Sequence, residues 1–599
     1  MNPTSSSALS PAAYNRFLLL VAGLGGLLYG IDVGIISSAL PYLEATSDLN
    51  SGQLSIVVAA VLLGSVISTL FAGALADWMG RKALMTASGV FFVLSIPIIA
   101  LSHGYGVLLL GRLLQGVSGG LIGVVVPLYL AECLVASQRG KGTGIFQWLL
   151  TFGIVVAAGI GLYFSFRVDE VAKLADPAKL RAFENAAWRS IFWVSLPPGL
   201  LFVIGSFMVA ESPRWLLRQG RKNAALAALL RSRTGEQAGS ELQEMQETLA
   251  AEKAKSSGGK ATESLLQRKY VIPFAMACII LACNQATGIN SIIGYNTKIL
   301  LQSGLSDVTA HWGYFVFTLI NFLVTWGAVV LVDRKGRKFL LSVGTAGIIF
   351  SLIHAGLLFR QTEKLRVDTS GPVQTMVTAD QKLTLAYNGE VASSLLSKAG
   401  SDAAGIGSGP TSMIVIYSYG DFRAATKVAR SNDIAAKPIE ITREGCIPAN
   451  KVVAFFSNPF GSLDAARSAP LRIENALITP VPSTHDGWLV AISLFVFMAF
   501  FAIGPGVCVW LALSELMPTR IRSNGMSIAL LINQAVSTTI AAVFLPSVGK
   551  YGYSTMFFGF AACTVVYFIT AAFFLPETKG KTLEEIEAYF SRTKPSAAN

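Results

Sequence analysis

"GALADWMGRKALM" (residues 73–85) returns later in the chain as "VVLVDRKGRKFLL" (329–341). In each copy an apolar run ends in an aspartate, and a glycine and two basic residues follow. Two further pairs keep the same order, namely "LYLAECLVASQRGKGTGI" (128–145) with "LALSELMPTRIRSNGMSI" (511–528), and "AESPRWLLRQGRK" (210–222) with "LPETKGKTLEEIE" (575–587). Because three stretches recur in one order, we expect two structurally similar halves.

The apolar content of the chain indicates a membrane protein. Hydrophobic residues make up 53% of the 599 positions, and charged residues only 14%. Lipid offers the backbone no hydrogen bonds, so apolar runs of about 18 residues or more are expected to be helices that span the bilayer. We find twelve such runs, near 17–40, 53–76, 84–103, 106–131, 142–165, 190–209, 271–300, 311–332, 338–359, 487–513, 525–548 and 554–575.

The repeats divide these helices into two groups of six. Two bundles of this kind enclose a central cavity that can open to either side of the membrane in turn. The predicted division is an N-terminal six-helix bundle (1–217), a linker with short helices (218–270), helices 7–9 (271–359), an insertion (360–486), and helices 10–12 with a short tail (487–599).

The net charge of +12 follows this topology. Most of the positive excess lies in loops after even-numbered helices, such as "DWMGRK" (77–82), whereas the insertion is almost balanced. Lys and Arg are enriched in cytoplasmic loops, so we expect both termini in the cytoplasm and the insertion outside. Attraction to anionic lipid explains the basic loops, and we expect no nucleic-acid partner.

The insertion contains short stretches rich in β-forming residues, separated by Gly, Asn, Ser and Pro. They predict a small, mainly β domain outside the membrane, with a disordered loop as the alternative. The expected strands lie within "KLTLAYNG" (382–389), "SMIVIYSYGDF" (412–422), "PIEITREG" (438–445) and "KVVAFF" (451–456).

Five motifs together resemble the sugar porter family of the major facilitator superfamily. The resemblance implies an all-α membrane protein with twelve transmembrane helices in two six-helix bundles, and proton-coupled transport of a monosaccharide or polyol. Both halves carry it, and only the insertion and the extreme N-terminus are omitted. The motifs are "PLYLAE" (127–132), "ESPRWL" (211–216), "QATGIN" (285–290), "GPGVCVW" (504–510) and "PETKGKTLEEI" (576–586).

The resemblance also implies a substrate site made mainly of amides. Amide groups both donate and accept hydrogen bonds, as sugar hydroxyls do, and an aromatic ring covers the C–H face of a sugar. Hydrogen bonding between helices is the alternative role for each amide. Two positions of this site depart from the family pattern, Asn284 in place of a glutamine and Gln534 where tryptophan is common, and they leave the substrate open. The expected residues are Gln147, Asn284, Gln285, Asn290, Asn321, Trp510, Asn533 and Gln534.

Glycine and proline at membrane depth predict interruptions that allow these helices to bend. We expect them at "GGLLYG" (25–30) on helix 1, at "TGIN" (287–290) on helix 7, and at "GPGV" (504–507) on helix 10.

Asp32 is an acid inside an apolar helix, where a lone charge is costly. Counted along helices 1 and 4, Asp32 and Arg112 fall at similar depth, so a buried pair avoids the cost that each would bear alone. We interpret Asp32 as a proton carrier whose protonation releases Arg112. A static structural pair is the alternative. Proton-coupled sugar porters are similar to the sequence at both positions.

A second group of charges lies where the helices meet the cytoplasm. By resemblance these residues form ion pairs that hold the outward-open state and break on inward opening, although the basic members also serve as topology signals. They are Asp77, Arg81, Glu132, Arg139, Glu211, Arg214, Asp333, Arg337, Glu515, Arg522 and Glu577.

The sequence contains no arrangement typical of an enzyme, a metal site or a nucleotide-binding loop. We therefore expect no cofactor, only the proton gradient as the driving force, in a multi-pass protein of the cell (inner) membrane that works as a monomer. A facilitative uniporter and a non-transporting sugar sensor remain alternatives. The insertion either caps the outer mouth or binds an unknown partner.

Overall fold

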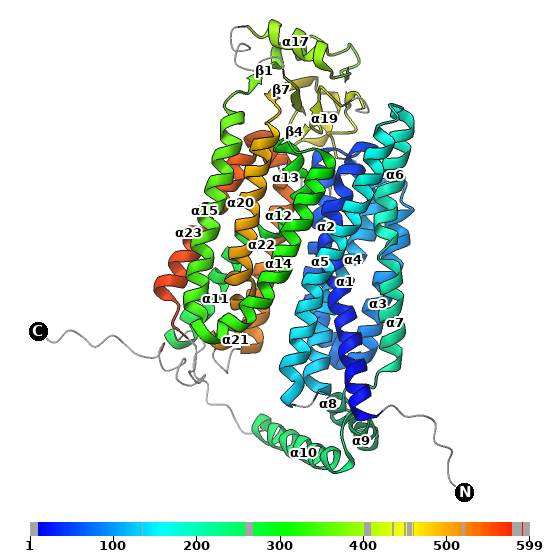
Figure 1. The fold of residues 1–599 in the computed structure, drawn as a ribbon, viewed down its shortest axis with the longest axis vertical. Coiled ribbons are helices and arrows are strands. Elements are labelled where there is room, and N and C mark those ends of the chain that lie inside the picture. Colours follow the sequence, from blue (N-terminus) through cyan, green and yellow to red (C-terminus); the bar gives the residue numbers. More distant parts are fainter. Residues whose placement is uncertain are drawn as a thin grey trace, which may run out of the picture.

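The computed structural model describes residues 10–134, 136–257, 267–400, 409–433, 437–448, 451, 454, 458, 460–517, 522–577 and 590. Twelve helical segments in this part of the chain are long and apolar enough to cross a membrane. This confirms the predicted class, an all-α membrane protein with twelve spans (Figure 1).

The first half forms one bundle, drawn in blue and cyan in Figure 1. Its sixth span is made of two helices in series. The helices are α1 (Pro11–Thr46), α2 (Ser51–Met79), α3 (Arg81–Ala100), α4 (Tyr105–Cys133), α5 (Ala136–Ala172), α6 (Pro177–Trp193) and α7 (Leu196–Met208). Three linker helices follow, α8 (Pro213–Arg218), α9 (Lys222–Leu230) and α10 (Gly235–Ser257), and they lie together at one end of the molecule.

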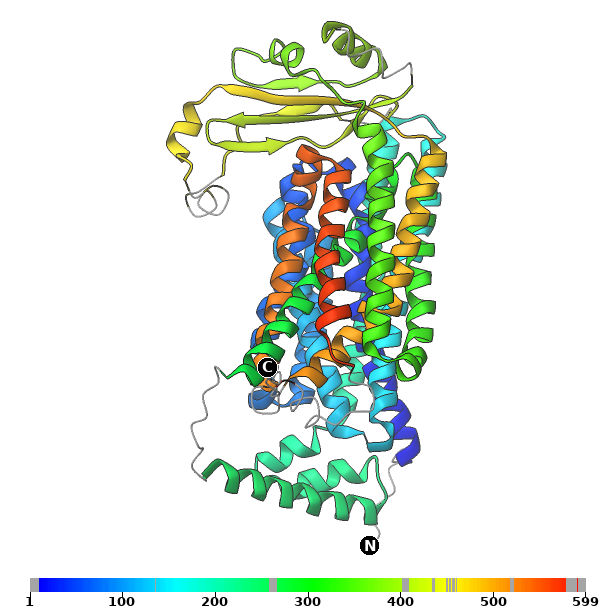
Figure 2. The same cartoon turned by 90° about the vertical axis from the view of Figure 1, so that its left-hand side faces the viewer.

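The second half forms the other bundle, beside the first. Its helices are α11 (Arg268–Ala286), α12 (Ile289–Gly294), α13 (Asn296–Gln302), α14 (Asp307–Lys335), α15 (Arg337–Glu363), α20 (Thr484–Ile503), α21 (Pro505–Leu516), α22 (Arg522–Tyr551) and α23 (Tyr553–Ile569) with a π-helical turn (Thr570–Phe574). The insertion leaves this bundle after α15 and returns at α20. Figure 2 shows it across the end opposite the linker helices. We call these the insertion end and the linker end.

Two of the three predicted helix interruptions are present. The seventh span breaks between α11 and α12, where Gly288 adopts a left-handed backbone (φ 82°), and the tenth breaks between α20 and α21 at Gly504 and Pro505. The interruption predicted in helix 1 is wrong, because α1 is continuous from Pro11 to Thr46.

The glycines of "GGLLYG" instead allow α1 to pack tightly against α5. A Cβ on Gly30 would lie 1.9 Å from the carbonyl oxygen of Leu150, and one on Gly26 would lie 2.3 Å from that of Phe146. Small residues allow membrane helices to approach in this way. The same sequence pattern that suggests a bend therefore produces a close helix contact.

The insertion folds around a five-stranded antiparallel sheet with the order β1–β7–β3–β4, in which β5 also pairs with β3. A separate pair joins β2 to β6. The strands are β1 (Val367–Asp368), β2 (Leu383–Leu385), β3 (Thr411–Tyr419), β4 (Phe422–Ala425), β5 (Ala429–Arg430), β6 (Ile439–Ile441) and β7 (Leu471–Pro480), and the helices are α16 (Ser370–Gln374), α17 (Gly389–Lys398) and α19 (Leu463–Ser468).

Three of the four expected strand stretches contain strands. The fourth, at 451–456, does not fit, because its described residues Lys451 and Ala454 are helical and the other four lie outside the described part. The longest strand, β7, was not expected from the sequence. It pairs with β3 from Thr411 opposite Pro480 to Tyr419 opposite Leu471, with an irregularity between Ile416 and Tyr417.

The insertion contacts the loop between α1 and α2, which belongs to the other bundle. We call residues 44–51 the α1–α2 corner. Lys427 donates to the carbonyl oxygens of Glu44 (2.5 Å) and Ser47, and Ser51 donates to Ala425 O (3.0 Å). Asn50 donates to Gly445 O (2.7 Å). Burial lowers the pKa of Lys427 to about 8, although the neighbouring Glu44 acts in the opposite direction.

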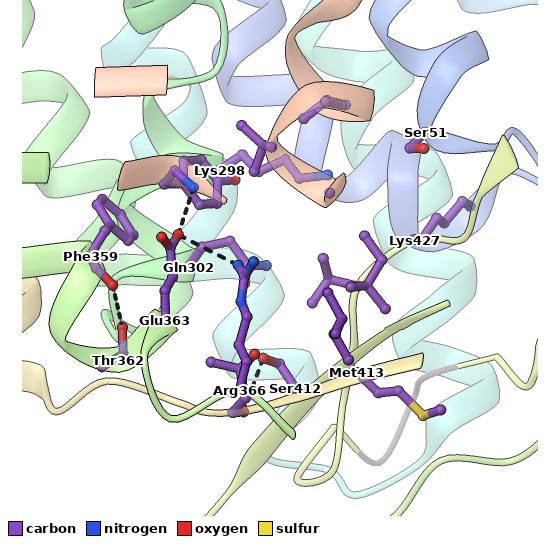
Figure 3. Close-up of a pocket in the computed structure, with 18 of the residues that line it drawn as sticks. Ser51, Lys298, Gln302, Phe359, Thr362, Glu363, Arg366, Ser412, Met413 and Lys427 are labelled. Carbon is purple, nitrogen blue, oxygen red and sulfur yellow. Dashed lines mark hydrogen bonds and ion pairs between the residues drawn. The ribbon is translucent and has the colours of Figure 1, made fainter. Parts of the chain in front are cut away.

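The same β4–β5 segment also reaches the second bundle. Arg430 donates to the carbonyl oxygen of Leu301, at the C-terminal end of α13. Lys427 and Arg430 therefore each neutralise the negative end of a helix, one from each bundle. Figure 3 shows a pocket that Lys427 of this segment helps to line, together with Lys298, Gln302 and Glu363 on the helices and Ser412 and Met413 of β3.

Candidate functional site

Asp32 and Arg112 face each other between α1 and α4. Both side chains are 1% exposed, and Nη1 of Arg112 lies 3.9 Å from Oδ1 of Asp32. That distance is too long for a hydrogen bond, but it leaves two buried opposite charges strongly coupled. Gly119 makes room for the carboxylate, since a Cβ there would lie 2.9 Å from Oδ2 of Asp32. The pair predicted from helix depth is thus brought together.

Three of the expected substrate amides form one hydrogen-bonded cluster. Gln285 Nε2 donates to Asn533 Oδ1 (3.2 Å), and Asn290 Nδ2 donates to Gln285 Oε1 (3.0 Å). Asn290 also donates to Ser537 Oγ (2.7 Å), and Asn533 donates to the carbonyl oxygen of Leu281 (3.0 Å). These groups satisfy one another's hydrogen bonds, so a ligand hydroxyl binding here would have to replace an existing bond.

The break in the seventh span creates this cluster. Residues five apart on an unbroken helix point about 140° away from each other. Gly288 redirects the chain between Gln285 and Asn290, and both then face α22. A side chain at Gly288 is excluded twice, by its positive φ and by the ring of Phe560, whose Cδ2 lies 2.4 Å from the ideal Cβ position.

The other expected substrate residues lie apart from these bonds. Asn284 is buried, and its Oδ1 accepts no hydrogen bond from any described residue. Asn321 accepts a bond from Thr325 (3.3 Å) on its own helix. Gln147 on α5 and Gln534 on α22 are half-buried. The side chain of Trp510 lies outside the described part of the chain.

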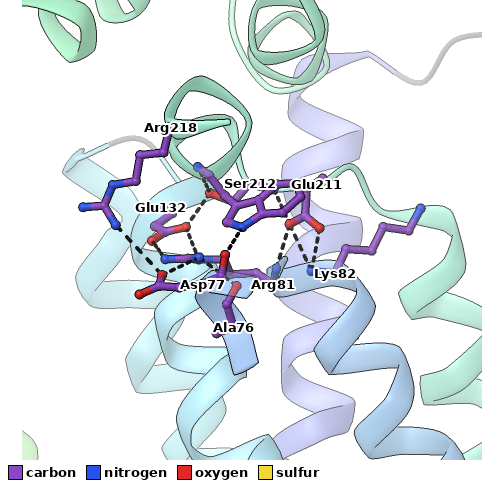
Figure 4. Close-up of polar contacts among 9 residues, drawn as sticks. Ala76, Asp77, Arg81, Lys82, Glu132, Glu211, Ser212 and Arg218 are labelled. Carbon is purple, nitrogen blue, oxygen red and sulfur yellow. Dashed lines mark hydrogen bonds and ion pairs between the residues drawn. The ribbon is translucent and has the colours of Figure 1, made fainter. Parts of the chain in front are cut away.

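The charges of the first half meet at the linker end, as Figure 4 shows. Nε of Arg81 lies 2.9 Å from Oε2 of Glu132, and its Nη1 lies 2.9 Å from Oδ1 of Asp77. Glu132 also accepts from the hydroxyl of Ser212, just before α8. Arg81 and Glu132 are buried, so this group joins α2, α3, α4 and the linker more firmly than a surface pair does.

Glu211 completes this group by capping α3. Its Oε1 accepts from the backbone N–H groups of Arg81 (2.9 Å) and Lys82 (3.0 Å), where the helix dipole favours an anion. In the second half Glu577 does the same for α15, accepting from the backbone of Arg337 (3.2 Å) and Lys338 (3.3 Å).

The remaining predicted members of this charge network are less defined. Arg214 is exposed at the linker end. The side chains of four others lie outside the described part of the chain, namely Arg139, Asp333, Glu515 and Arg522. The ion pairs that the structure gives for the predicted network join helices within one bundle.

At the insertion end, polar bonds join the two bundles directly. Lys298 of α13 pairs with Glu44 of α1 (2.6 Å), and the hydroxyl of Tyr42 donates to Asp307 of α14 (2.7 Å). Tyr314 donates to the carbonyl oxygen of Gly34 (2.9 Å). The bundles are therefore held together at the insertion end.

The sequence pattern did not single out several of these partners. Ser537 lies one turn from the predicted site residue Asn533. Gln115, whose Oε1 accepts from Arg112 Nη1 (2.6 Å), lies one turn from Arg112. Their spacing from a predicted residue is the one signal that the sequence provides. Glu44 and Lys298 carry no such signal, because they meet only through the fold. Among the described residues, no three His, Cys, Asp or Glu side chains come together as metal ligands.

A family model described as "Sugar (and other) transporter" matches residues 18–378 and 476–590. The chain belongs to the sugar porter family. The unmatched interval falls within the insertion, and both repeats are included in the match. The protein is therefore a sugar transporter of the major facilitator superfamily, and not an enzyme.

Individual relatives agree with this assignment. This sugar porter is 26% identical over 576 residues to the glucose transporter GlcP of Staphylococcus epidermidis, covering 96% of this chain and 97% of the relative. It is 30% identical over 357 residues to the galactose-proton symporter of Escherichia coli K12 (58% and 72% covered). It is 25% identical over 596 residues to the human proton myo-inositol cotransporter (96% and 82% covered).

Among solved structures, the sugar porter resembles a partially occluded inward-open conformation of the xylose transporter XylE from E. coli. The TM-score is 0.62 at 19% sequence identity, with 95% of this chain and 99% of the other covered. A similarity at that level establishes the shared fold of two six-helix bundles.

Proposed function

We propose that this sugar porter takes up a monosaccharide or a polyol by proton symport, with alternating access of one central site. The observation that carries the proposal is the buried pair of Asp32 and Arg112. Burying an acid in a spanning helix costs free energy, so an acid found there indicates a functional site. A carboxylate that can take up and release a proton is suited to coupling transport to the proton gradient. The proton gradient is the driving force in this proposal, and no bound cofactor takes part.

The cluster of Gln285, Asn290, Asn533 and Ser537 supports a polyhydroxylated, uncharged substrate. Its amides and hydroxyl offer both donors and acceptors without a buried charge. Two relatives named above are described as a galactose-proton symporter and a proton myo-inositol cotransporter, which is in keeping with both parts of the proposal.

We place the protein in the cell (inner) membrane, with the linker end in the cytoplasm and the insertion outside. The basic loops near Arg81 and Arg337 support this orientation. Because Lys298 and Glu44 join the bundles at the insertion end, we infer a conformation that is closed outside and faces inward, and transport then requires those bonds to break. The central site lies within one chain, so a monomer suffices.

Transport by reconstituted protein tests the proposal. Proteoliposomes are loaded and assayed with labelled D-glucose, D-galactose, D-xylose and myo-inositol, with and without a pH gradient that is acidic outside. Symport predicts accumulation above equilibrium only with the gradient. Asp32→Asn should abolish that accumulation and leave exchange of labelled for unlabelled substrate intact.

Two other outcomes would contradict the proposal. Uptake that equilibrates at the same rate with and without the gradient indicates a uniporter. Binding of a sugar without any exchange indicates a sensor. The double variant Gln285→Ala/Asn533→Ala, which we expect to lose substrate binding, serves as the control for leakage.

A further inference from the structure

Arg112 makes its shortest side-chain contact with Gln115, and not with the acid that it faces. Nη1 of Arg112 lies 2.6 Å from Oε1 of Gln115, compared with 3.9 Å from Oδ1 of Asp32. Gln115 is fully buried, one turn after Arg112 on α4. Both carboxylate oxygens of Asp32 accept no hydrogen bond from any described residue. The Arg112 guanidinium is thus hydrogen-bonded to the amide of Gln115 and not to the carboxylate of Asp32.

A buried guanidinium needs an acceptor in every state of the transporter, because leaving it unpaired is costly. An ionised Asp32 can be that acceptor, but a protonated Asp32 has lost its charge and is a much weaker acceptor for a cation. Gln115 is an acceptor that never titrates. Its Nε2 has no partner among the described residues, so its bond to Arg112 is the contact that fixes the amide.

The surroundings contain no competitor for this role within the described residues. Arg112 is the charged side chain whose field acts on Asp32, and the phenol of Tyr29 lies one turn away on α1 itself. From α6, the ring of Phe192 lies 5.6 Å from the guanidinium carbon of Arg112 and offers no acceptor. Besides Arg112, α4 presents the bare backbone of Gly119 to Asp32, which offers no charged group.

We propose that Gln115 is a positioning residue for proton coupling, which holds the Arg112 guanidinium whenever Asp32 is protonated and returns it when Asp32 ionises. This inference rests on the proposed proton symport and adds a group to it. The Arg112 guanidinium then has two positions, one bonded to Gln115 and one paired with ionised Asp32. The present structure shows the position at Gln115. By stabilising the protonated state, Gln115 raises the pH at which Asp32 takes up its proton.

Infrared titration of the purified full-length protein tests this without a substrate. The carboxylic acid C=O band that disappears in Asp32→Asn reports the protonation of Asp32 directly. Gln115→Met removes the acceptor at nearly constant volume, and the midpoint of that band should move to lower pH by about one unit or more, a tenfold change in proton affinity. Gln115→Glu, which binds Arg112 more tightly, should move it to higher pH.

Ser118→Ala is the matched control. Ser118 is fully buried on the same helix, and its hydroxyl donates to the carbonyl oxygen of Ser88 (2.8 Å), away from Arg112. It should leave the midpoint unchanged. An unchanged midpoint in both Gln115 variants would overturn the role of Gln115 while leaving symport intact. Absence of any titrating band that Asp32→Asn removes would instead overturn the proton-carrier function, and this inference with it.

Discussion

Glu211 and Glu577 occupy equivalent positions in the two halves and cap equivalent helices. Each accepts from the first two backbone N–H groups of the third membrane span of its half, α3 or α15. Each also lies against a glycine with positive φ, Gly80 (95°) or Gly336 (86°). A Cβ would lie 2.3 Å from Oε2 of Glu211 at Gly80, and 2.5 Å from Oε2 of Glu577 at Gly336. The repeat seen in the sequence is therefore a repeated helix cap.

Alanine at either glycine should destabilise the protein. Gly80→Ala and Gly336→Ala would each impose an unfavourable left-handed backbone and displace the capping glutamate, which together cost about 2 kcal/mol. Thermal unfolding in detergent should show a lower midpoint for both variants. Gly327→Ala is the control, because this glycine lies within α14 and nothing lies within 4 Å of its ideal Cβ. An equal fall in the unfolding midpoint of Gly327→Ala would contradict a stabilising role of the glutamate caps.

The amide cluster should dominate substrate affinity. Asn533→Ala removes an acceptor from Gln285 and a donor from the carbonyl oxygen of Leu281, so we expect binding of the transported sugar to weaken about tenfold or more. Asn321→Ala removes a residue whose hydrogen bond is to its own helix and should have a smaller effect. Calorimetric titration measures the affinity of each purified variant for the sugar. A larger loss of affinity in Asn321→Ala than in Asn533→Ala would show that the substrate site lies elsewhere.

Contacts between the insertion and the bundles should depend on Lys427 and Arg430. The double variant Lys427→Met/Arg430→Met keeps the length of the lysine side chain and removes both donors to helix ends. Backbone amides of the α1–α2 corner should then exchange hydrogen at least about tenfold faster, since about 1.4 kcal/mol corresponds to each factor of ten. Arg423→Met is the control, because Arg423 pairs with Glu474 inside the insertion (2.8 Å). Exchange that stays unchanged in the double variant would show that apolar contacts hold the insertion.

Asp368 should make the stability of the insertion depend on pH in the acidic range. Burial acts to raise its pKa, but hydrogen bonds from the Ala476 backbone, the Asn475 side chain and the Ser370 backbone outweigh this and hold the pKa below its ordinary value. A lowered pKa means that the stabilisation is complete above about pH 4 and is lost as the pH falls through the folded-state value.

Hydrogen exchange along β7 measures that effect. Asp368→Asn should speed exchange at neutral pH, and its difference from the wild type should shrink as the pH falls and the wild-type carboxylate takes up its proton. Asp464→Asn, at an exposed carboxylate on α19, should match the wild type at every pH. A difference between Asp368→Asn and wild type that persists at the lowest pH would assign the effect to packing and not to charge.

Much of the fold could be predicted because its signals are local or repeated. The apolar runs predict the positions of the spans. The recurrence of the motif at 73–85 in residues 329–341 predicts the division into two halves. The uninterrupted α1 could not be foreseen, because glycine serves a bend and a close helix contact equally well. Strand β7 was missed because Glu474 and Asn475 disrupt the alternation of its apolar residues, and its pairing with β3 spans many intervening positions.

The candidate site was predictable residue by residue but not as a network. Helix depth was enough to match Asp32 with Arg112. The interruption at Gly288 was predicted, but nothing in the sequence showed that its left-handed backbone turns Gln285 and Asn290 towards Asn533. Gln115 was overlooked because the formal charge of Asp32 made it the expected partner of Arg112.

The insertion has an asymmetric attachment with a kinetic consequence. Its sheet is continuous in sequence with α15 and α20, yet Lys427 is bonded to the carbonyl oxygens at the end of α1. If the bundles separate at that end, the insertion moves with the second bundle, and its bonds to the first bundle must break in every transport cycle. The return of the empty carrier would then be timed by the rupture of these few bonds, whatever cargo it had delivered.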